Sequence, residues 1–168
     1  MKDHEYTKLL IEQYKIMVGS TEKVTEQRSK SNTFFMSIVT ALVSVSFFVG
    51  KAFEFTFISV LIIIALTILN LIIINFWNKM IESYGKLNKG KFVLIFELER
   101  KLRSNLFERE WEILTNKDNI NYEPNTQTEL KVVSWFKKFI YIMLLCEFIY
   151  LFYLFCKYIY FKMNFIFA

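Results

Sequence analysis

The sequence has few of the residues that turn-rich, disulfide-rich or metal-binding proteins need. Only one of its 168 residues is proline and four are glycine, so long uninterrupted helices are favoured over strands and turns. The two cysteines, Cys146 and Cys156, fall inside one apolar run, which argues against a disulfide framework. The single histidine, His4, is near the N-terminus, and no Cys/His cluster has metal-ligand spacing. We therefore expect neither a metal site nor a cofactor.

Sequence signatures of catalysis are missing as well. The chain contains no glycine-rich phosphate loop, no nucleophile elbow and no HExxH zinc motif. The carboxylates Glu108, Glu110 and Glu112 have no obvious catalytic partner nearby in the sequence. We expect that the protein is not an enzyme.

Hydrophobic residues are abundant. They make up 54% of the chain, and the mean hydropathy is +0.31. A bilayer core about 30 Å thick requires roughly 20 apolar residues of helix, and residues 33–49, 55–77 and 139–156 approach or reach this length. We predict an all-α integral membrane protein with these three transmembrane helices. The first of them is expected to direct insertion, because no cleavable signal peptide precedes it.

Positive charge predicts the orientation, because Lys and Arg are retained on the cytoplasmic side of the membrane. Residues 1–32 carry six Lys or Arg and residues 78–138 carry twelve, whereas the loop between the first two spans carries only Lys51. The N-terminal helix and the helical region 78–138 are therefore predicted to form a cytoplasmic layer. The odd number of spans sends the short aromatic tail, residues 157–168, to the opposite side.

The helical pattern extends from the first span into the N-terminal segment. Small and apolar side chains recur there at spacings of three and four, the signature of one helix face: Leu10, Tyr14, Met17, Thr21 and Val24. Arg28, Asn32 and Phe35 continue the same stripe. Because no turn signal interrupts it, this helix is expected to run straight into the first span.

A second helix is predicted after the second span, from about residue 81 to residue 102. Tyr84, Asn88 and Lys91 share one of its faces, next to the apolar one. A run of charges at its end is expected to be a solvated face: Glu97, Glu99, Arg100, Lys101 and Arg103.

A loop is predicted between this region and the third span. A segment around Glu110 and Trp111 comes first, and residues 115–128 follow as the predicted loop, rich in turn-forming residues: Asn116, Asp118, Asn119, Asn121, Pro124 and Asn125. Thr128 is a possible cap for the last helix, which continues into the third span.

Taken together, these segments resemble a known family. The stretch from residue 14 to residue 35, with its Glu26, Gln27, Arg28, Asn32, Phe34 and Phe35, is similar to the first helix of the small RipA-like oligomeric membrane proteins of bacteria. The resemblance covers most of the chain through further positions: Tyr84, Leu87, Asn88, Lys91, Phe92, Glu97, Glu99, Glu110, Trp111, Pro124, Thr128 and Glu129.

The resemblance implies a homo-oligomeric ring in the bacterial inner membrane. Some similar proteins are encoded beside nucleotidyltransferases in anti-phage defence, as in the Hailong system. The membrane partner there looks like an effector controlled by an oligonucleotide that its neighbour makes. The family pattern has Tyr-Arg where this sequence has Tyr84–Gly85, so no role of an arginine at that position carries over.

One ionisable residue, Glu147, lies deep in the third span, where an isolated carboxylate is unfavourable. A ring of such residues around an oligomer axis would form a cation-selective constriction. The other interpretation is a structural hydrogen bond to a neighbouring helix, through Asn70 or Asn75. The sequence leaves both open.

The first span carries three hydroxyl groups on one face, those of Ser37, Thr40 and Ser44. Small polar residues let helices pack closely, and their hydroxyls can bond back to helix carbonyls. A helix contact is therefore one interpretation, and a pore lining is the other.

The basic cytoplasmic surface allows three interpretations. Attraction to anionic lipid explains Lys79, Lys137 and Lys138, and a plain solvated surface is the second. Binding of a nucleotide or a single-stranded oligonucleotide needs cations and aromatic stacking platforms. The candidates for such a site are Arg28, Asn32, Tyr84, Lys86, Asn88, Lys89, Lys91, Arg100, Arg103 and Trp111.

The leading functional hypothesis is a homo-oligomeric inner-membrane effector. It would be a ligand-gated, ion-conducting pore in anti-phage defence, controlled by a nucleotide or oligonucleotide bound on the cytoplasmic side. The alternative is a non-conducting membrane scaffold or envelope-maintenance protein.

Overall fold

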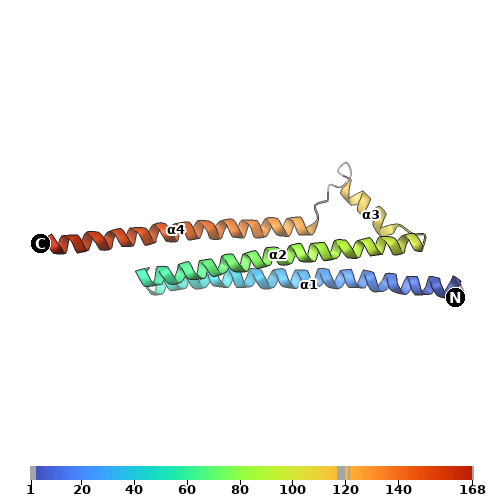
Figure 1. Cartoon of the computed structure of the whole chain (residues 1–168), viewed down its shortest axis with the longest axis horizontal. Helices are drawn as coiled ribbons and strands as arrows, with labels where there is room; N and C mark the ends of the chain where they lie inside the picture. The colour runs from blue at the N-terminus through green and yellow to red at the C-terminus, as the bar shows by residue number, and fades with distance from the viewer. Residues whose placement is uncertain (1–2, 117–119, 121, 168) are drawn as a thin grey trace. The chain divides into compact units, whose positions relative to one another are not determined.

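A computed structural model describes residues 3–116, 120 and 122–167 of the chain. Within these residues the secondary structure consists of four α-helices (Figure 1): α1 Asp3–Ala52, α2 Phe57–Lys101, α3 Leu106–Thr115 and α4 Asn125–Phe167. Helices α1, α2 and α4 are each long and apolar enough to cross a membrane. The prediction of an all-α membrane protein with three apolar helices agrees with this structure.

The expected continuity of the first helix is confirmed, because α1 runs without a break from Asp3 to Ala52. Helix α4 likewise continues to Phe167, so the predicted aromatic tail is helical as far as that residue.

The predicted loop 115–128 is too long. Helix α4 begins at Asn125, and the carbonyl oxygen of Pro124 accepts a hydrogen bond of 2.8 Å from the N–H of Gln127. Thr128 is therefore inside the first turn and does not cap the helix. The proline explains the early start, because its fixed φ angle favours a helix beginning. Asp118, Asn119 and Asn121 of the predicted loop lie outside the described residues.

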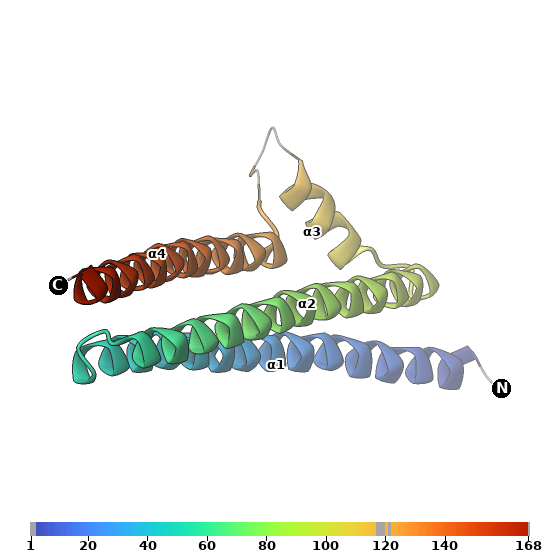
Figure 2. The ribbon, with the colours of Figure 1, turned by 60° about the vertical axis from the view of Figure 1, so that its left-hand side comes forward.

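The chain divides into two units, and α1, α2 and α4 contribute to both. We call the first the polar unit: α1 up to Asn32, together with Lys79–Lys131, which includes α3. Inside it α1 and α2 lie side by side (Figure 2) and bury a row of apolar side chains: Leu10, Val24, Ile81 and Ile95. The predicted stripe on α1 is thus a real packing face, and it includes the buried Thr21 and Arg28.

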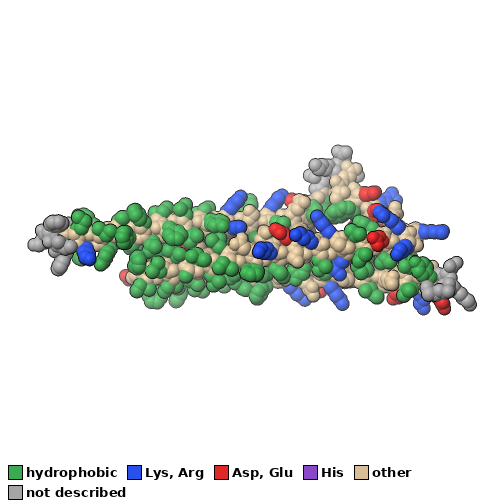
Figure 3. All heavy atoms as spheres, viewed as in Figure 1, with side chains coloured by type: hydrophobic (Ala, Val, Ile, Leu, Met, Phe, Trp, Pro, Cys, Tyr) green, Lys and Arg blue, Asp and Glu red, His purple; other side chains and the backbone are tan. Residues whose placement is uncertain are grey.

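The second, apolar unit comprises Thr33–Asn78 and α4 from Val132 onward. Its core contains Val39, Val60, Ile63, Ile74, Trp77 and Ile140. The Trp77 ring lies between two others, with centroid distances of 6.3 Å to Phe35 and 5.9 Å to Phe136. Many large apolar side chains of this unit nevertheless face outward (Figure 3), including Phe48 and Ile58, at 71% and 70% exposure. Such a surface suits lipid or neighbouring copies of the chain.

The turn between α1 and α2 depends on a glycine. It comprises residues 53–56 and not the predicted residues 50–54, because the N–H of Phe53 still bonds to the carbonyl of Val49. Glu54 and Phe55 have positive φ angles of 47° and 50°. The Phe55 ring is so close to Gly50 that a Cβ there would lie 2.5 Å from it. Gly50 therefore makes this close approach possible.

Candidate functional site: an intramembrane carboxyl group and a polar seam

Glu147 lies on the part of α4 that belongs to the apolar unit, and it is half-buried. The hydroxyl of the fully buried Thr67, on α2, donates a hydrogen bond of 2.7 Å to its Oε1 atom. The Oε2 atom is also buried, and among the described residues it has no hydrogen-bond partner. Only one of the two carboxyl oxygen atoms therefore has a hydrogen bond among the described residues.

Neither of the two predicted partners of Glu147 is the one observed. Asn70 is buried, but its Oδ1 atom has no partner among the described residues. The Oδ1 atom of Asn75 instead accepts a hydrogen bond of 2.9 Å from Lys137, which we had expected to attract lipid. Thr67 is a hydroxyl residue in the apolar part of α2, but Asn70 lies three residues further on, so no signal in the sequence favoured Thr67.

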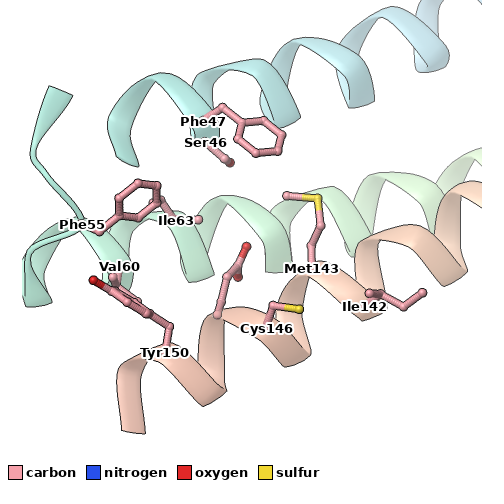
Figure 4. Close-up of a pocket in the computed structure, with 10 residues that line it drawn as sticks. Ser46, Phe47, Phe55, Val60, Ile63, Ile142, Met143, Cys146 and Tyr150 are labelled. Atoms are coloured by element: carbon pink, nitrogen blue, oxygen red, sulfur yellow. The ribbon is translucent and has the colours of Figure 1, made fainter. Parts of the chain in front are cut away.

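The carboxyl group of Glu147 lines a groove of about 460 Å³ in the apolar unit. Helix α1 contributes Ser46 and Phe47 to this groove, and the turn contributes Phe55 (Figure 4). The other walls come from α2 and α4: Val60, Ile63, Ile142, Met143, Cys146 and Tyr150. We call this the Glu147 groove.

The three hydroxyl residues of the first span lie on the outside of the apolar unit. Ser37, Thr40 and Ser44 are all exposed. Each hydroxyl donates to the carbonyl oxygen four residues earlier, at 2.9, 2.7 and 2.9 Å. The predicted back-bonding is confirmed, and the face is available to water, lipid or a neighbouring copy.

Four of the predicted ligand-binding residues form a polar seam inside the polar unit. Tyr84, Asn88 and Lys91 of α2 bond to three hydroxyl residues of α1: Ser31, Thr25 and Ser20. Arg28 is only 6% exposed. These four side chains therefore make contacts between helices, and Tyr84, Asn88 and Lys91 remain half-buried.

Arg28 bridges the beginning of α4. Its Nη1 atom donates to the hydroxyl of Thr126 at 3.2 Å, and its Nε atom is 3.4 Å from Oε1 of Glu129. Thr126 also lies close to Gly85, where a Cβ would be 2.9 Å from its methyl group. The position of Arg28 on the apolar stripe of α1 was the sequence signal that this cation needed a buried partner.

The remaining predicted ligand-binding residues are not gathered into one pocket. Asn32 is half-buried, while Lys86, Lys89, Arg100, Arg103 and Trp111 are exposed. Arg100 is paired with Glu108, whose hydrogen bond and charge raise the pKa of Arg100 above its ordinary value. The structure thus splits the predicted site into an internal seam and a set of exposed side chains.

The charged residues around Glu99 had predicted a solvated face, but Glu99 is not part of one. It is 1% exposed and accepts hydrogen bonds from the N–H groups of Phe107 and Glu108, at 3.1 and 3.4 Å. These are the second and third residues of α3, whose cap residue Asn105 makes no side-chain capping bond. Glu99 therefore supplies the missing cap and attracts the positive end of the helix dipole.

Glu99 also accepts a hydrogen bond of 3.3 Å from the hydroxyl of Tyr14. Burial raises the pKa of Tyr14, and the charge of Glu99 and the hydrogen bond to it add to the increase. The Tyr14 ring lies near Phe107 of α3, with a centroid distance of 6.3 Å. One carboxylate thus joins α1, α2 and α3.

Comparison with known proteins yields one family match. The model of a family described as the octameric membrane protein family matches residues 11–156. No curated protein and no solved structure matches the chain.

Proposed function

Because the chain belongs to the octameric membrane protein family, we propose that eight copies assemble as a ring in a bacterial inner membrane and form an ion-conducting pore. Membership makes the chain a homo-oligomeric membrane protein. Three spans are too few to enclose a pore within one chain, so the lumen has to be built from several copies. Octamers supply 24 spans, which is ample for a ring with a central opening.

The observation that carries the pore proposal is the exposed hydroxyl face of α1. Most of the outer surface of the apolar unit is hydrocarbon, but Ser37, Thr40 and Ser44 present oxygen atoms along one line. In a ring, one side of each chain faces the axis, and polar side chains lower the free energy of water there. We assign this face to the lumen. Glu147, which bonds to Thr67 of its own chain, faces the Glu147 groove instead.

Ion flux into liposomes containing the purified octamer tests this assignment. Replacing Ser37, Thr40 and Ser44 together by leucine is expected to reduce ion flux at least tenfold, because water is excluded from an apolar constriction. Replacing the exposed Val45 by leucine is the matched control and should leave flux unchanged. Intact octamers without flux under any ligand condition would refute the pore, and equal flux from the leucine variant would refute the lumen assignment.

We further propose that the polar unit is cytoplasmic and senses a nucleotide or an oligonucleotide. Lys and Arg are far more numerous in this unit than in the loop between the first two spans, and this difference supports the orientation. Exposed cations and an exposed indole support the ligand class, since backbone phosphates need positive charge and bases stack on aromatic rings: Lys86, Lys89, Arg103 and Trp111. A nucleotidyltransferase encoded nearby, as in anti-phage defence, would supply such a ligand.

Binding of a fluorescent single-stranded oligonucleotide to the octamer at several salt concentrations tests the ligand class. The double variant K86A/K89A should bind several-fold more weakly and show a shallower salt dependence. A second double variant, K8A/K23A, removes two exposed lysines of α1 and is the charge-matched control. No binding at low salt, or the same loss in both variants, would argue against the site.

The second candidate function is a non-conducting scaffold that maintains the envelope or anchors a partner. The polar seam favours it, because Tyr84, Asn88 and Lys91 are occupied within the chain. The flux measurement separates the two candidates.

A further inference from the structure

The Glu147 groove combines three properties that each constrain what can occupy it. The first is an unsatisfied acceptor. Thr67 uses only Oε1 of the carboxyl group, and Oε2 is buried without a partner among the described residues. A buried carboxyl oxygen without a hydrogen bond is unfavourable, so an occupant that donates a hydrogen bond there is stabilised.

The second property is a set of aromatic rings. Phe47, Phe55 and Tyr150 all line the groove (Figure 4). Phe55 and Tyr150 meet edge to face, with a centroid distance of 6.0 Å and an interplanar angle of 76°. The faces of aromatic rings carry negative potential and attract ammonium groups. Rings beside a carboxylate therefore favour a cationic head group over a neutral or anionic one.

The third property is the apolar character of the remaining wall, which comes from Val60, Ile63, Ile142 and Met143. Ser46 adds little polarity, because its hydroxyl already donates to the carbonyl of Leu42 at 3.0 Å. A volume of about 460 Å³ lies in the range of small-molecule sites. The occupant thus needs a hydrocarbon body as well as a cationic head.

We propose that the Glu147 groove binds a hydrophobic amine, whose ammonium group donates a hydrogen bond to Oε2 of Glu147 and whose hydrocarbon body lies between Phe47 and Tyr150. A lipid acyl chain would fill the same space but would leave Oε2 unpaired. An ionised fatty acid would place a second negative charge against the carboxyl group of Glu147. Charge and hydrogen bonding therefore select the amine. This inference is independent of the pore proposal, because binding is measured without ion flux.

Cysteine reactivity offers a direct test. Both thiols are exposed on α4, but only that of Cys146 lines the groove, so Cys156 serves as the internal control. The experiment measures alkylation of both thiols by a small maleimide in the octamer, in nonionic detergent, with decylamine or decanol as the probe. Decylamine should slow alkylation of Cys146 at least fivefold and leave Cys156 unchanged. Decanol should slow alkylation of Cys146 far less, because its hydroxyl can donate one hydrogen bond but carries no positive charge.

A charge variant separates recognition from simple filling of the groove. Protection of Cys146 by decylamine should disappear in Glu147→Gln and persist in Glu54→Gln, which removes an exposed carboxylate of the turn. Equal protection by decanol would overturn the proposal and indicate an acyl-chain site. A Cys146 that is unreactive without any probe would also overturn it, because a second copy of the chain would then cover the groove. The comparison of the two probes requires only the unmodified chain.

Discussion

The attachment of α3 through Glu99 leads to a quantitative prediction. Helix α3 has no buried residue of its own, so its position depends strongly on the carboxylate that caps it. Replacing Glu99 by alanine removes the acceptor for the N–H groups of Phe107 and Glu108 and for the hydroxyl of Tyr14. We expect α3 to open from the polar unit far more often, while the long helices remain folded.

The magnitude follows from the three hydrogen bonds. Loss of a helix cap costs about 0.5–2 kcal/mol, and a buried donor left unpaired costs about 1–3 kcal/mol. The two N–H groups can turn to water when α3 opens, so the contributions do not add in full. We expect a net loss of about 2 kcal/mol, which corresponds to roughly a 30-fold increase in opening.

Hydrogen–deuterium exchange of the intact oligomer measures this opening. Amides of α3 in Glu99→Ala should exchange roughly 30-fold faster than in the unmodified chain. Glu97→Ala is the matched control, because this exposed carboxylate is only two residues away and does not cap α3. Unchanged exchange in Glu99→Ala, or equal acceleration in both variants, would refute the capping role.

Three further predictions concern other contacts. Replacing Arg28 by methionine leaves the Glu129 carboxylate without its cation and should lower the stability by about 3 kcal/mol in thermal unfolding. The double variant that also carries Glu129→Leu should recover most of the lost stability, and no recovery would argue against the Arg28–Glu129 ion pair. Gly50→Ala should lower the unfolding temperature and Phe55→Ala in the same chain should restore it, because the clash is with that ring. Since the pKa of Tyr14 is raised, the stabilisation that its hydroxyl gives is fully present below the ordinary tyrosine pKa of 10.0 and is lost as the pH rises through the folded-state pKa. The difference in unfolding temperature between the unmodified chain and Tyr14→Phe should therefore stay constant up to about pH 10 and shrink above it.

Helix faces were predictable from the sequence because their spacing is local. Leu10, Thr21, Val24 and Arg28 were placed on one face of α1 and are all buried there. The unbroken course of α1 followed from the same pattern, which no proline interrupts.

Partners that are distant in the sequence were not predictable. Thr67 and Glu147 are 80 residues apart, and the spacing of polar residues on α2 gave no reason to prefer Thr67 over Asn70. Periodicity reports which face a side chain is on, but not which rotamer meets which neighbour across a helix pair.

Glu99 illustrates a different limit. It stands among charges that look like a solvated surface, and its role depends on a turn that reverses the chain at Arg103, where φ is positive at 55°. Only this turn brings the first N–H groups of α3 back to the carboxylate. The turn contains no glycine or proline from which it could have been predicted.

The hydroxyl groups on the outside of α1 have a defined hydrogen-bonding polarity. Each of the three hydroxyl groups donates its only hydrogen atom to a carbonyl oxygen of the preceding turn: Ser37, Thr40 and Ser44. Their oxygen atoms therefore present only lone pairs to the outside. A surface of acceptors attracts donors and cations and gives anions nothing to bind. Eight such rows around an axis would therefore distinguish the sign of a passing ion without any charged side chain among them.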